Sequence, residues 1–154
     1  MSINKRPQWD MEGKMIYEFE VEGDINGKGR PRVNTYTGHA YTPSKTKDYE
    51  DFIKQNFKIK YPKYEPFTGR VSVTIIAYFK IPKNTSKKNE SLMHNGTLSP
   101  TKKPDIDNIV KIILDGLNKM AFADDNQITK LDVEKKYVEN ELDKEKIYVK
   151  IEEY

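Results

Sequence analysis

The chain has 154 residues, a formal net charge of +3 and a hydrophobic fraction of 36%, with no cysteine and only His39 and His94 as histidines. This length fits one domain with one core, and the 11% of aromatic residues argues against disorder. The lack of cysteine excludes disulfides, thiolate zinc sites and a cysteine nucleophile. Any catalysis is therefore expected to rely on carboxylates and lysines.

No apolar run approaches the roughly 18 residues of a membrane span, and the first residues carry no apolar signal-peptide region. We therefore expect a cytoplasmic protein without membrane contact.

The positive charge is unevenly distributed along the sequence. Six lysines against one acid, Glu90, lie between Lys80 and Lys103, and Lys28-Gly29-Arg30-Pro31-Arg32 is a second basic group. Such groups suit a polyanionic substrate, although a solvated loop would also explain the first.

In chain order, residues 1–13 are expected to form a loose leader. Alternating apolar residues over 15–21 then predict a half-buried strand. Glycine and proline interrupt residues 23–38. Together with extended pieces at Arg32–Tyr36 and Ala40–Thr42, this stretch predicts an irregular hairpin.

Thr42 and Pro43 form a typical helix start, with threonine as the N-cap and proline at the first helical position. Apolar residues then recur at helical spacing until about residue 60: Tyr49, Phe52, Ile53, Phe57 and Tyr61. Residues 69–81 alternate clearly and are rich in β-branched side chains, which predicts a strand.

Residues 82–103 are polar throughout, and a loop of this length is usually functional or disordered, so we expect a mobile basic loop. A second helix is predicted from residue 105 to about 120. Its expected core stripe is Ile106, Ile109, Val110, Ile113, Leu117 and Met120. Residues 127–138 and 145–153 then predict a closing pair of strands.

This order of elements predicts an α+β fold, with two helices packed on one mixed β-sheet in a single domain spanning residues 1–154. The step from residue 69 to residue 138 has the form strand, loop, helix, strand. It is compatible with a parallel crossover.

The informative segment for chemistry begins at Lys103-Pro104-Asp105. Asp105 is a good N-cap candidate because Pro104 disfavours helix before it. Asp107 then falls in the first turn, and Lys111 lies four residues on, on the same helix face. Two carboxylates and an amine are thus presented together beside a helix N-terminus.

Asp124-Asp125-Asn126 follows the helix. An antiparallel return would carry this turn to the helix C-terminus, about 20 Å from Asp105. Spacing alone does not decide whether the acids meet. The alternatives are ordinary: a capping aspartate, a surface pair of Asp107 with Lys111, and turn chemistry at Asp124–Asn126.

The run KPDIDNIVKIILDGLNKMAFADDNQI, residues 103–128, resembles the signature of the RusA family of Holliday junction resolvases. That family carries Asp-x-Asp-Asn-x-x-Lys, a further aspartate, and then a pair of aspartates opening a strand. The upstream GKGRPR is similar to basic stretches near the start of phage-type members.

The resemblance implies that Asp105, Asp107 and Asp125 are metal-binding catalytic carboxylates that converge in space, and that Lys111 is a catalytic lysine. The segment before the aspartate pair is about one residue shorter than in some members, so either Asp124 or Asp125 matches the inner ligand, and we favour Asp125.

The resemblance implies a Mg²⁺-dependent endodeoxyribonuclease, with Mn²⁺ as a substitute, that resolves four-way DNA junctions as a homodimer during recombination and repair. A phage or prophage origin fits it. The expected phosphate contacts are Lys28, Arg30, Arg32, Lys87, Lys88, Lys102 and Lys103. Two other functions stay open: a non-catalytic junction-binding protein, and a metal-dependent nucleotide phosphohydrolase that would act without DNA.

Overall fold

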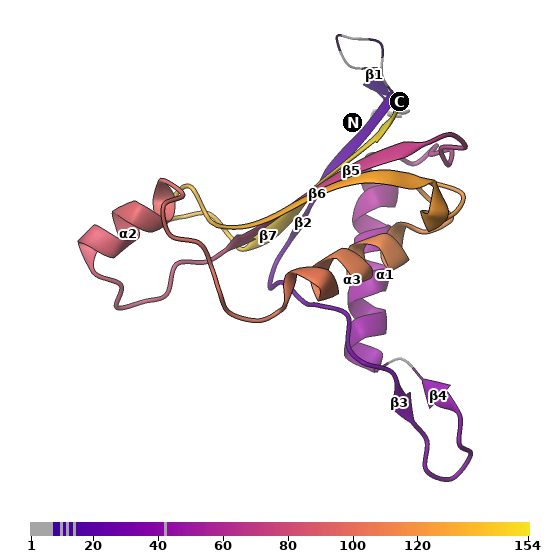
Figure 1. The fold of residues 1–154 in the computed structure, drawn as a ribbon, viewed down its shortest axis with the longest axis horizontal. Helices are drawn as coiled ribbons and strands as arrows, with labels where there is room; N and C mark the ends of the chain where they lie inside the picture. The colour runs from indigo at the N-terminus through magenta and orange to yellow at the C-terminus, as the bar shows by residue number, and fades with distance from the viewer. Residues whose placement is uncertain (1–7, 10, 12, 14, 42) are drawn as a thin grey trace.

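The protein, described here by a computed structural model covering residues 8, 9, 11, 13, 15–41 and 43–154, is built on a mixed sheet (Figure 1). The sheet has the order β1-β2-β7-β5-β6 and consists of β1 (Gln8–Trp9), β2 (Met15–Glu22), β5 (Val71–Phe79), β6 (Ile128–Tyr137) and β7 (Lys146–Glu153). A separate hairpin of β3 (Arg32–Val33) and β4 (Ala40–Tyr41) projects from the body.

Strand β7 lies in the middle of the sheet, because both β2 and β5 pair with it in antiparallel register. Tyr17 faces Ile151 on one side, and Ile75 faces Val149 on the other. Strict alternation of buried and half-buried side chains along β5 follows from the two-residue period of a strand whose one face is covered.

Strands β5 and β6 are parallel, which confirms the predicted crossover. The connection contains α2 (Lys87–His94) and α3 (Ile106–Leu117), followed by a 3₁₀ turn, η1 (Asp125–Gln127). The two strands predicted to close the sheet, β6 and β7, do not pair with each other. Strand β5 lies between them, because the crossover places β6 on the outer side of β5.

Helices α1 (Ser44–Lys60) and α3 cover one face of the sheet and pack against each other, which confirms the predicted α+β architecture. Gly116 allows the close approach, since a Cβ there would lie 3.1 Å from Cγ2 of Ile53. Below α1 the core is aromatic: the Tyr17 and Phe57 rings meet edge to face at 5.0 Å. Such pairs contribute beyond their buried area.

Several predictions at single positions were wrong. Ile106 was expected in the core stripe of its helix, but it is 43% exposed, whereas Ile112 is buried. Phe52, which fits the helical spacing of the first helix, is 41% exposed. Helix α1 begins at Ser44 with Pro43 at the N-cap position, one residue later than predicted. Thr42 lies outside the described residues.

The region expected as a loop, residues 82–103, contains α2. This helix buries no residue among those described, so it has no apolar stripe that periodicity could reveal. It is started by Ser86, whose Oγ accepts a hydrogen bond from Asn89 N at 3.2 Å. In the expected leader, Gln8–Trp9 pair with Met15–Ile16 as β1. Residues 1–7, 10 and 12 of that leader lie outside the described part of the chain.

Over the described part of the chain, no helix has both the length and the apolar character needed to cross a bilayer.

Glu145 ties three segments together just before β7. Its carboxylate accepts hydrogen bonds from Ile25 N and Lys80 N, both at 3.0 Å, and its carbonyl accepts one from Gly23 N at 2.8 Å. The side chain thus joins the segment after β2 to the segment after β5.

We expect Glu145→Ala to lower the free energy of unfolding by about 1–3 kcal/mol, because two backbone N–H groups lose a charged acceptor. Urea unfolding followed by circular dichroism measures this. Glu139→Ala, at an exposed position in the same turn region, is the control. Equal midpoints for the two variants would contradict the structural role of Glu145.

Candidate active site

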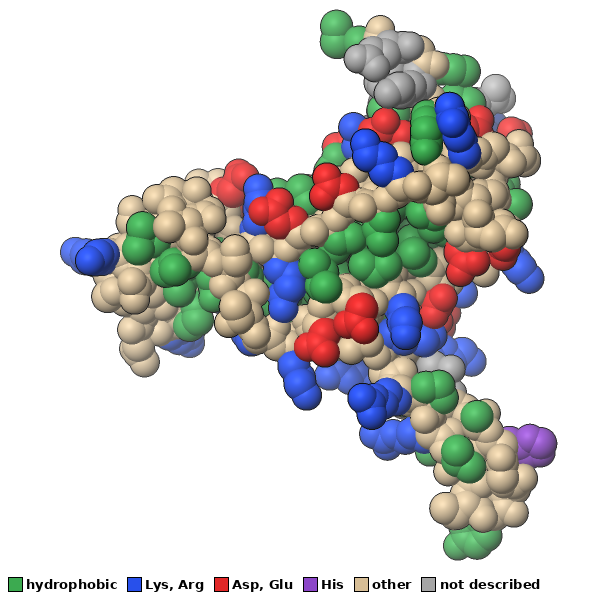
Figure 2. Space-filling model, in the orientation of Figure 1, with side chains coloured by type: hydrophobic (Ala, Val, Ile, Leu, Met, Phe, Trp, Pro, Cys, Tyr) green, Lys and Arg blue, Asp and Glu red, His purple; other side chains and the backbone are tan. Residues whose placement is uncertain are grey.

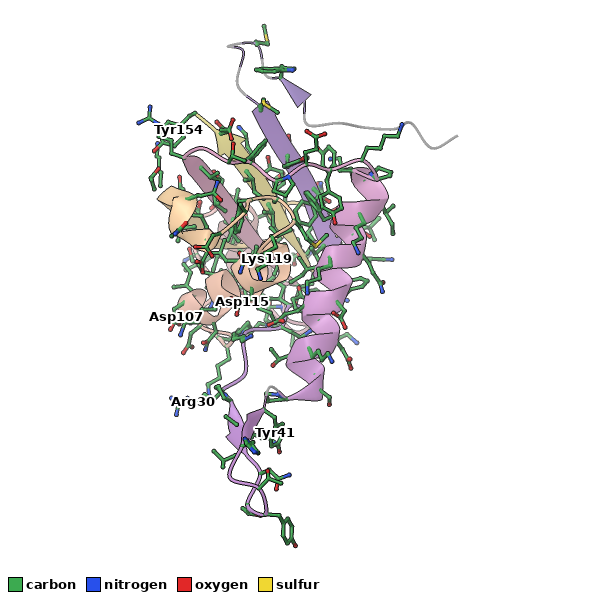
Figure 3. All side chains as sticks on the ribbon, turned by 90° about the vertical axis from the view of Figure 1, so that its right-hand side faces the viewer. Arg30, Tyr41, Asp107, Asp115, Lys119 and Tyr154 are labelled. Atoms are coloured by element: carbon green, nitrogen blue, oxygen red, sulfur yellow. The ribbon has the colours of Figure 1, made fainter. Side chains whose placement is uncertain are left out.

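The start of α3 presents two carboxylates and a lysine on the surface. Asp105 occupies the N-cap position with extended backbone angles, Asp107 lies in the first turn, and Lys111 follows one turn later. All three side chains are exposed. Figure 3 shows Asp107 on the outer side of α3, away from α1. The predicted juxtaposition of these three residues is therefore present.

Asp105 occupies the N-cap position, but its side chain accepts no hydrogen bond from the backbone N–H groups at the helix N-terminus. Among the described residues, no hydrogen bond or ion pair engages the carboxylates of Asp105 and Asp107 or the ammonium of Lys111. The simple alternatives, a capping aspartate and a surface pair of Asp107 with Lys111, are thus not formed. The oxygens of both carboxylates are free to bind a ligand.

The loop that leads into α3 is held by Lys135 of β6. Its ammonium donates to the carbonyl of Lys102 at 2.5 Å and to that of Pro104 at 3.1 Å. It also lies 5.1 Å from the centre of the Phe79 ring, a cation–π contact. Lys135 thus fixes the backbone on both sides of residue 103. The backbone position of Asp105, the next residue after Pro104, is fixed as a result.

Two glycines let the segment after β2 pass close to the start of α3, at Gly27, and to the start of α1, at Gly29. A Cβ at Gly27 would lie 2.7 Å from Cβ of Pro104, and Lys28 N donates to Asn108 O at 2.9 Å. At Gly29 a Cβ would lie 2.6 Å from Oγ1 of Thr46, which accepts a hydrogen bond from Gly29 N. The Gly-Lys-Gly sequence is therefore explained by close backbone approach.

The Lys28 side chain points inward, between two acids. Its ammonium pairs with Glu50 and, at 3.0 Å, with Asp115. Burial alone would lower its pKa, but the hydrogen bonds that the ammonium donates to Glu50 and Asp115 outweigh this effect, and the pKa of Lys28 is raised. This triad ties α1 to α3. Lys28 is thus a poorer candidate for phosphate contact than Arg30 and Arg32, which are exposed.

At the other end of α3, the two aspartates of the pair have different surroundings. Asp124 caps η1: its carboxylate accepts from Asn126 N at 3.4 Å, and its own N–H donates to Oε1 of Gln127 at 2.8 Å. Asp125 is exposed and free of such bonds among the described residues. This difference favours Asp125 over Asp124 as the functional residue.

Asp125 and the pair at Asp105 and Asp107 lie at opposite ends of α3. The 12 residues of the helix span about 18 Å. Along β6, the distance from Ile128 to Lys135, the residue beside Asp105, is about 23 Å. Accordingly, no three acidic or histidine side chains in the described part of the chain gather closely enough to hold a metal ion. The convergence that the resemblance implied is absent from the single chain.

Basic side chains flank the Asp105 end of α3: Lys102 and Lys103 precede Asp105, and Arg30 stands at the base of the β3–β4 hairpin. Lys87 and Lys88 also lie exposed, at the start of α2, which projects away from α3. In Figure 1 the α2 region and the hairpin project on either side of this end of α3. Figure 2 shows acidic side chains over α3 with Lys and Arg side chains around them. The surface is suited to a polyanion bound beside carboxylates.

Comparison with protein families decides the class of enzyme. The family model for "Endodeoxyribonuclease RusA" matches residues 22–152, which include both ends of α3 and the hairpin. The chain belongs to the RusA endodeoxyribonuclease family. It is also similar to "Uncharacterized protein YqaN" of Bacillus subtilis (strain 168), with 36% identity over 129 residues, which are 79% of this chain and 88% of that protein.

For this RusA-family chain, spacing in the sequence placed Asp105, Asp107 and Lys111 together at the start of α3, but it did not reveal the contacts of Lys135. The only signal for Lys135 was its place on a predicted strand, since the contact joins residues more than 30 positions apart. The role of Lys28 was also missed, because its partners Glu50 and Asp115 lie on two different helices.

We expect Lys135→Met to loosen the start of α3, because the methionine keeps the apolar stem but cannot donate to the two carbonyls. The free energy of unfolding should fall by about 1–2 kcal/mol. Backbone amide exchange at residues 105–109 should rise more than elsewhere in α3. Hydrogen exchange read by mass spectrometry measures both, with Lys130→Met, an exposed lysine of the same strand, as the control. Unchanged exchange over 105–109 would refute the anchoring role.

Proposed function

We propose that this protein is a Mg²⁺-dependent, structure-selective endonuclease that resolves four-way DNA junctions by symmetric phosphodiester hydrolysis, in recombination and repair. The observation that carries the proposal is the state of Asp105 and Asp107. Both carboxylates are held at a helix N-terminus by a fixed backbone, yet neither one bonds to another residue in the part of the chain that the structure describes. Because the chain belongs to an endodeoxyribonuclease family, phosphodiester hydrolysis is the reaction in which we expect this acidic pair to act.

The pair fits a hard divalent cation. Mg²⁺ prefers oxygen ligands and is usually held by one or two carboxylates together with water and substrate phosphate oxygens. Asp105 and Asp107 would supply those carboxylates, and Mn²⁺ is expected to substitute. When bound, the ion supplies a nucleophilic water and neutralises charge on the phosphoryl oxygens.

Lys111 lies one helical turn beyond Asp107 on the same face, and its ammonium is exposed. At this position it would stabilise the charge that develops on the phosphoryl group, or orient the attacking water. The helix N-terminus adds positive potential at the same place. These groups act on the phosphate, while the two aspartates hold the ion.

Asp125 joins such a site only from a second copy of the chain, since one chain keeps it about 20 Å away. A two-fold contact in which α3 runs antiparallel to its counterpart would bring each Asp125 to the other chain's Asp105 and Asp107. The surface between the two ends supports this: Ile106 and Leu131 are 43% and 44% exposed, and β6 is an edge strand. Figure 2 shows hydrophobic side chains gathered between β6 and α3.

A homodimer with two such sites matches a four-way junction, which itself has two-fold symmetry and must be cut at two symmetric strands. The exposed cations around the site would contact phosphates: Arg30, Arg32, Lys87, Lys88, Lys102 and Lys103. Contacts of this kind position the DNA without reading its sequence.

The decisive variant is Asp107→Asn. It removes one charge at an exposed position, so the fold should persist, and junction binding should remain within about two-fold. Cleavage of a synthetic four-way junction in Mg²⁺ should fall by at least about 100-fold, because removing a group that stabilises transition-state charge costs several kcal/mol. Glu139→Asn is the matched control on the surface.

Three outcomes of this assay would overturn the proposal. Junction binding without Mg²⁺-dependent nicking by the unmodified protein would make it a binding protein. Hydrolysis of free nucleotides without DNA would make it a phosphohydrolase. Equal cutting of a junction and of linear duplex would remove structure selectivity.

A subunit-mixing experiment tests whether Asp125 acts from the second copy. Asp107→Asn and Asp125→Asn homodimers should both be inactive. After co-expression, a mixed dimer would contain one site with both residues intact and one site lacking both. It should therefore nick one strand of the junction, whereas sites formed within single chains would stay inactive in every mixture. Gel analysis of junctions labelled on each strand reads the result.

A further inference from the structure

The β3–β4 hairpin, residues 30–41, projects from the domain as an arm that has no hydrophobic core of its own. Every side chain from Arg30 to Tyr41 is exposed, including Val33 at 61% and Tyr41 at 50% (Figure 1). A two-stranded hairpin alone in water is marginally stable, because it buries too little surface. Packing on the domain therefore does not explain why this segment forms a hairpin.

The tip of the arm is instead shaped by Asn34. Its side-chain oxygen accepts hydrogen bonds from Tyr36 N at 2.8 Å and Thr37 N at 3.3 Å, and its backbone bonds to His39 and Gly38. Gly38 has a φ of +70°, which glycine adopts without strain. The tip is thus a specified turn, which fixes the backbone of the residue at its apex.

That residue is Tyr36. Its side chain is 98% exposed, the most exposed of the aromatic side chains that the structure describes. A flat ring exposed to water on a turn with an ordered backbone offers a surface for another ring. The segment around it is strongly basic: it carries no Asp or Glu between Asp24 and Asp48. Aromatic rings combined with cations are the pattern used to bind unstacked bases and their phosphates.

The arm is rooted at the active-site surface. Its first residues continue directly from Gly27 and Gly29, which pack against Pro104 and Thr46. Figure 3 shows Arg30 on the same side of the molecule as Asp107, with Tyr41 further out along the arm. A nucleic acid bound at the acidic pair would pass the arm.

We propose that the β3–β4 hairpin senses the branch point of the DNA, with Tyr36 stacking on a base left unstacked there and Arg30 and Arg32 neutralising the adjacent phosphates. The proposal rests on the proposed function and names the feature of the substrate that this chain selects. The acid-free composition of the arm favours DNA over a second copy of this chain as its partner, because the arm has no acids to pair with the cations of a second arm.

The test uses Asp107→Asn protein, so that bound DNA is not cut, and a four-way junction carrying 2-aminopurine at the branch point. Tyr36→Ala should weaken junction binding about 10-fold and leave binding to linear duplex unchanged, because stacking on one base is lost. The fluorescence change of 2-aminopurine on binding should disappear. Tyr36→Trp should restore both signals. Leu142→Ala, which removes a side chain that is 97% exposed elsewhere, is the control.

The possible failures are distinct. If Asp107→Asn protein with an intact arm does not prefer the junction over duplex, the proposed function itself fails. If that preference exists but Tyr36→Ala retains it, or loses junction and duplex binding equally, the arm does not sense branches. A lower dimer fraction for Tyr36→Ala in sedimentation, with junction binding per dimer unchanged, would assign the arm to the second copy and overturn the proposal.

Discussion

The parallel pairing of β5 and β6 is the constraint on which the arrangement of the site depends. Parallel neighbours cannot be joined by a tight turn, so the chain has to travel back along the sheet before β6 can begin. Helix α3 makes that return. Consequently, whatever stands before the helix lies at one end of the strand pair, and whatever follows it lies at the other. The separation of Asp105 from Asp125 is a direct result of topology.

Much of the architecture could be predicted from the sequence because its long elements have strong periodicity. The alternation over Val71–Phe79 and the apolar stripe of α3 both carry a clear period, and both elements form as expected. Helix α2 has no such stripe and was missed. Ile106 fits the helical stripe by spacing, yet it is the first residue of α3, and it is exposed among the described residues.

For the site, local spacing was sufficient to place Asp105, Asp107 and Lys111 together, because a helix fixes those positions by itself. It could not describe how the helix start is held. That depends on Lys135 and Gly27, which reach the same loop from a strand and from a connecting segment. Nor could spacing tell which aspartate of the pair is free, since this depends on the capping bonds that Asp124 makes.

The central place of β7 in the sheet has a consequence for how the protein folds during its synthesis. The strands made early, β1 and β2, contact those made later, β5 and β6, within the sheet only through β7. During synthesis these two groups of strands cannot be joined within the sheet until residues 146–153 have left the ribosome. Pairing over such long separations in sequence slows folding. The sheet is therefore completed last, and a chain that ends before β7 lacks the strand that would align its two halves.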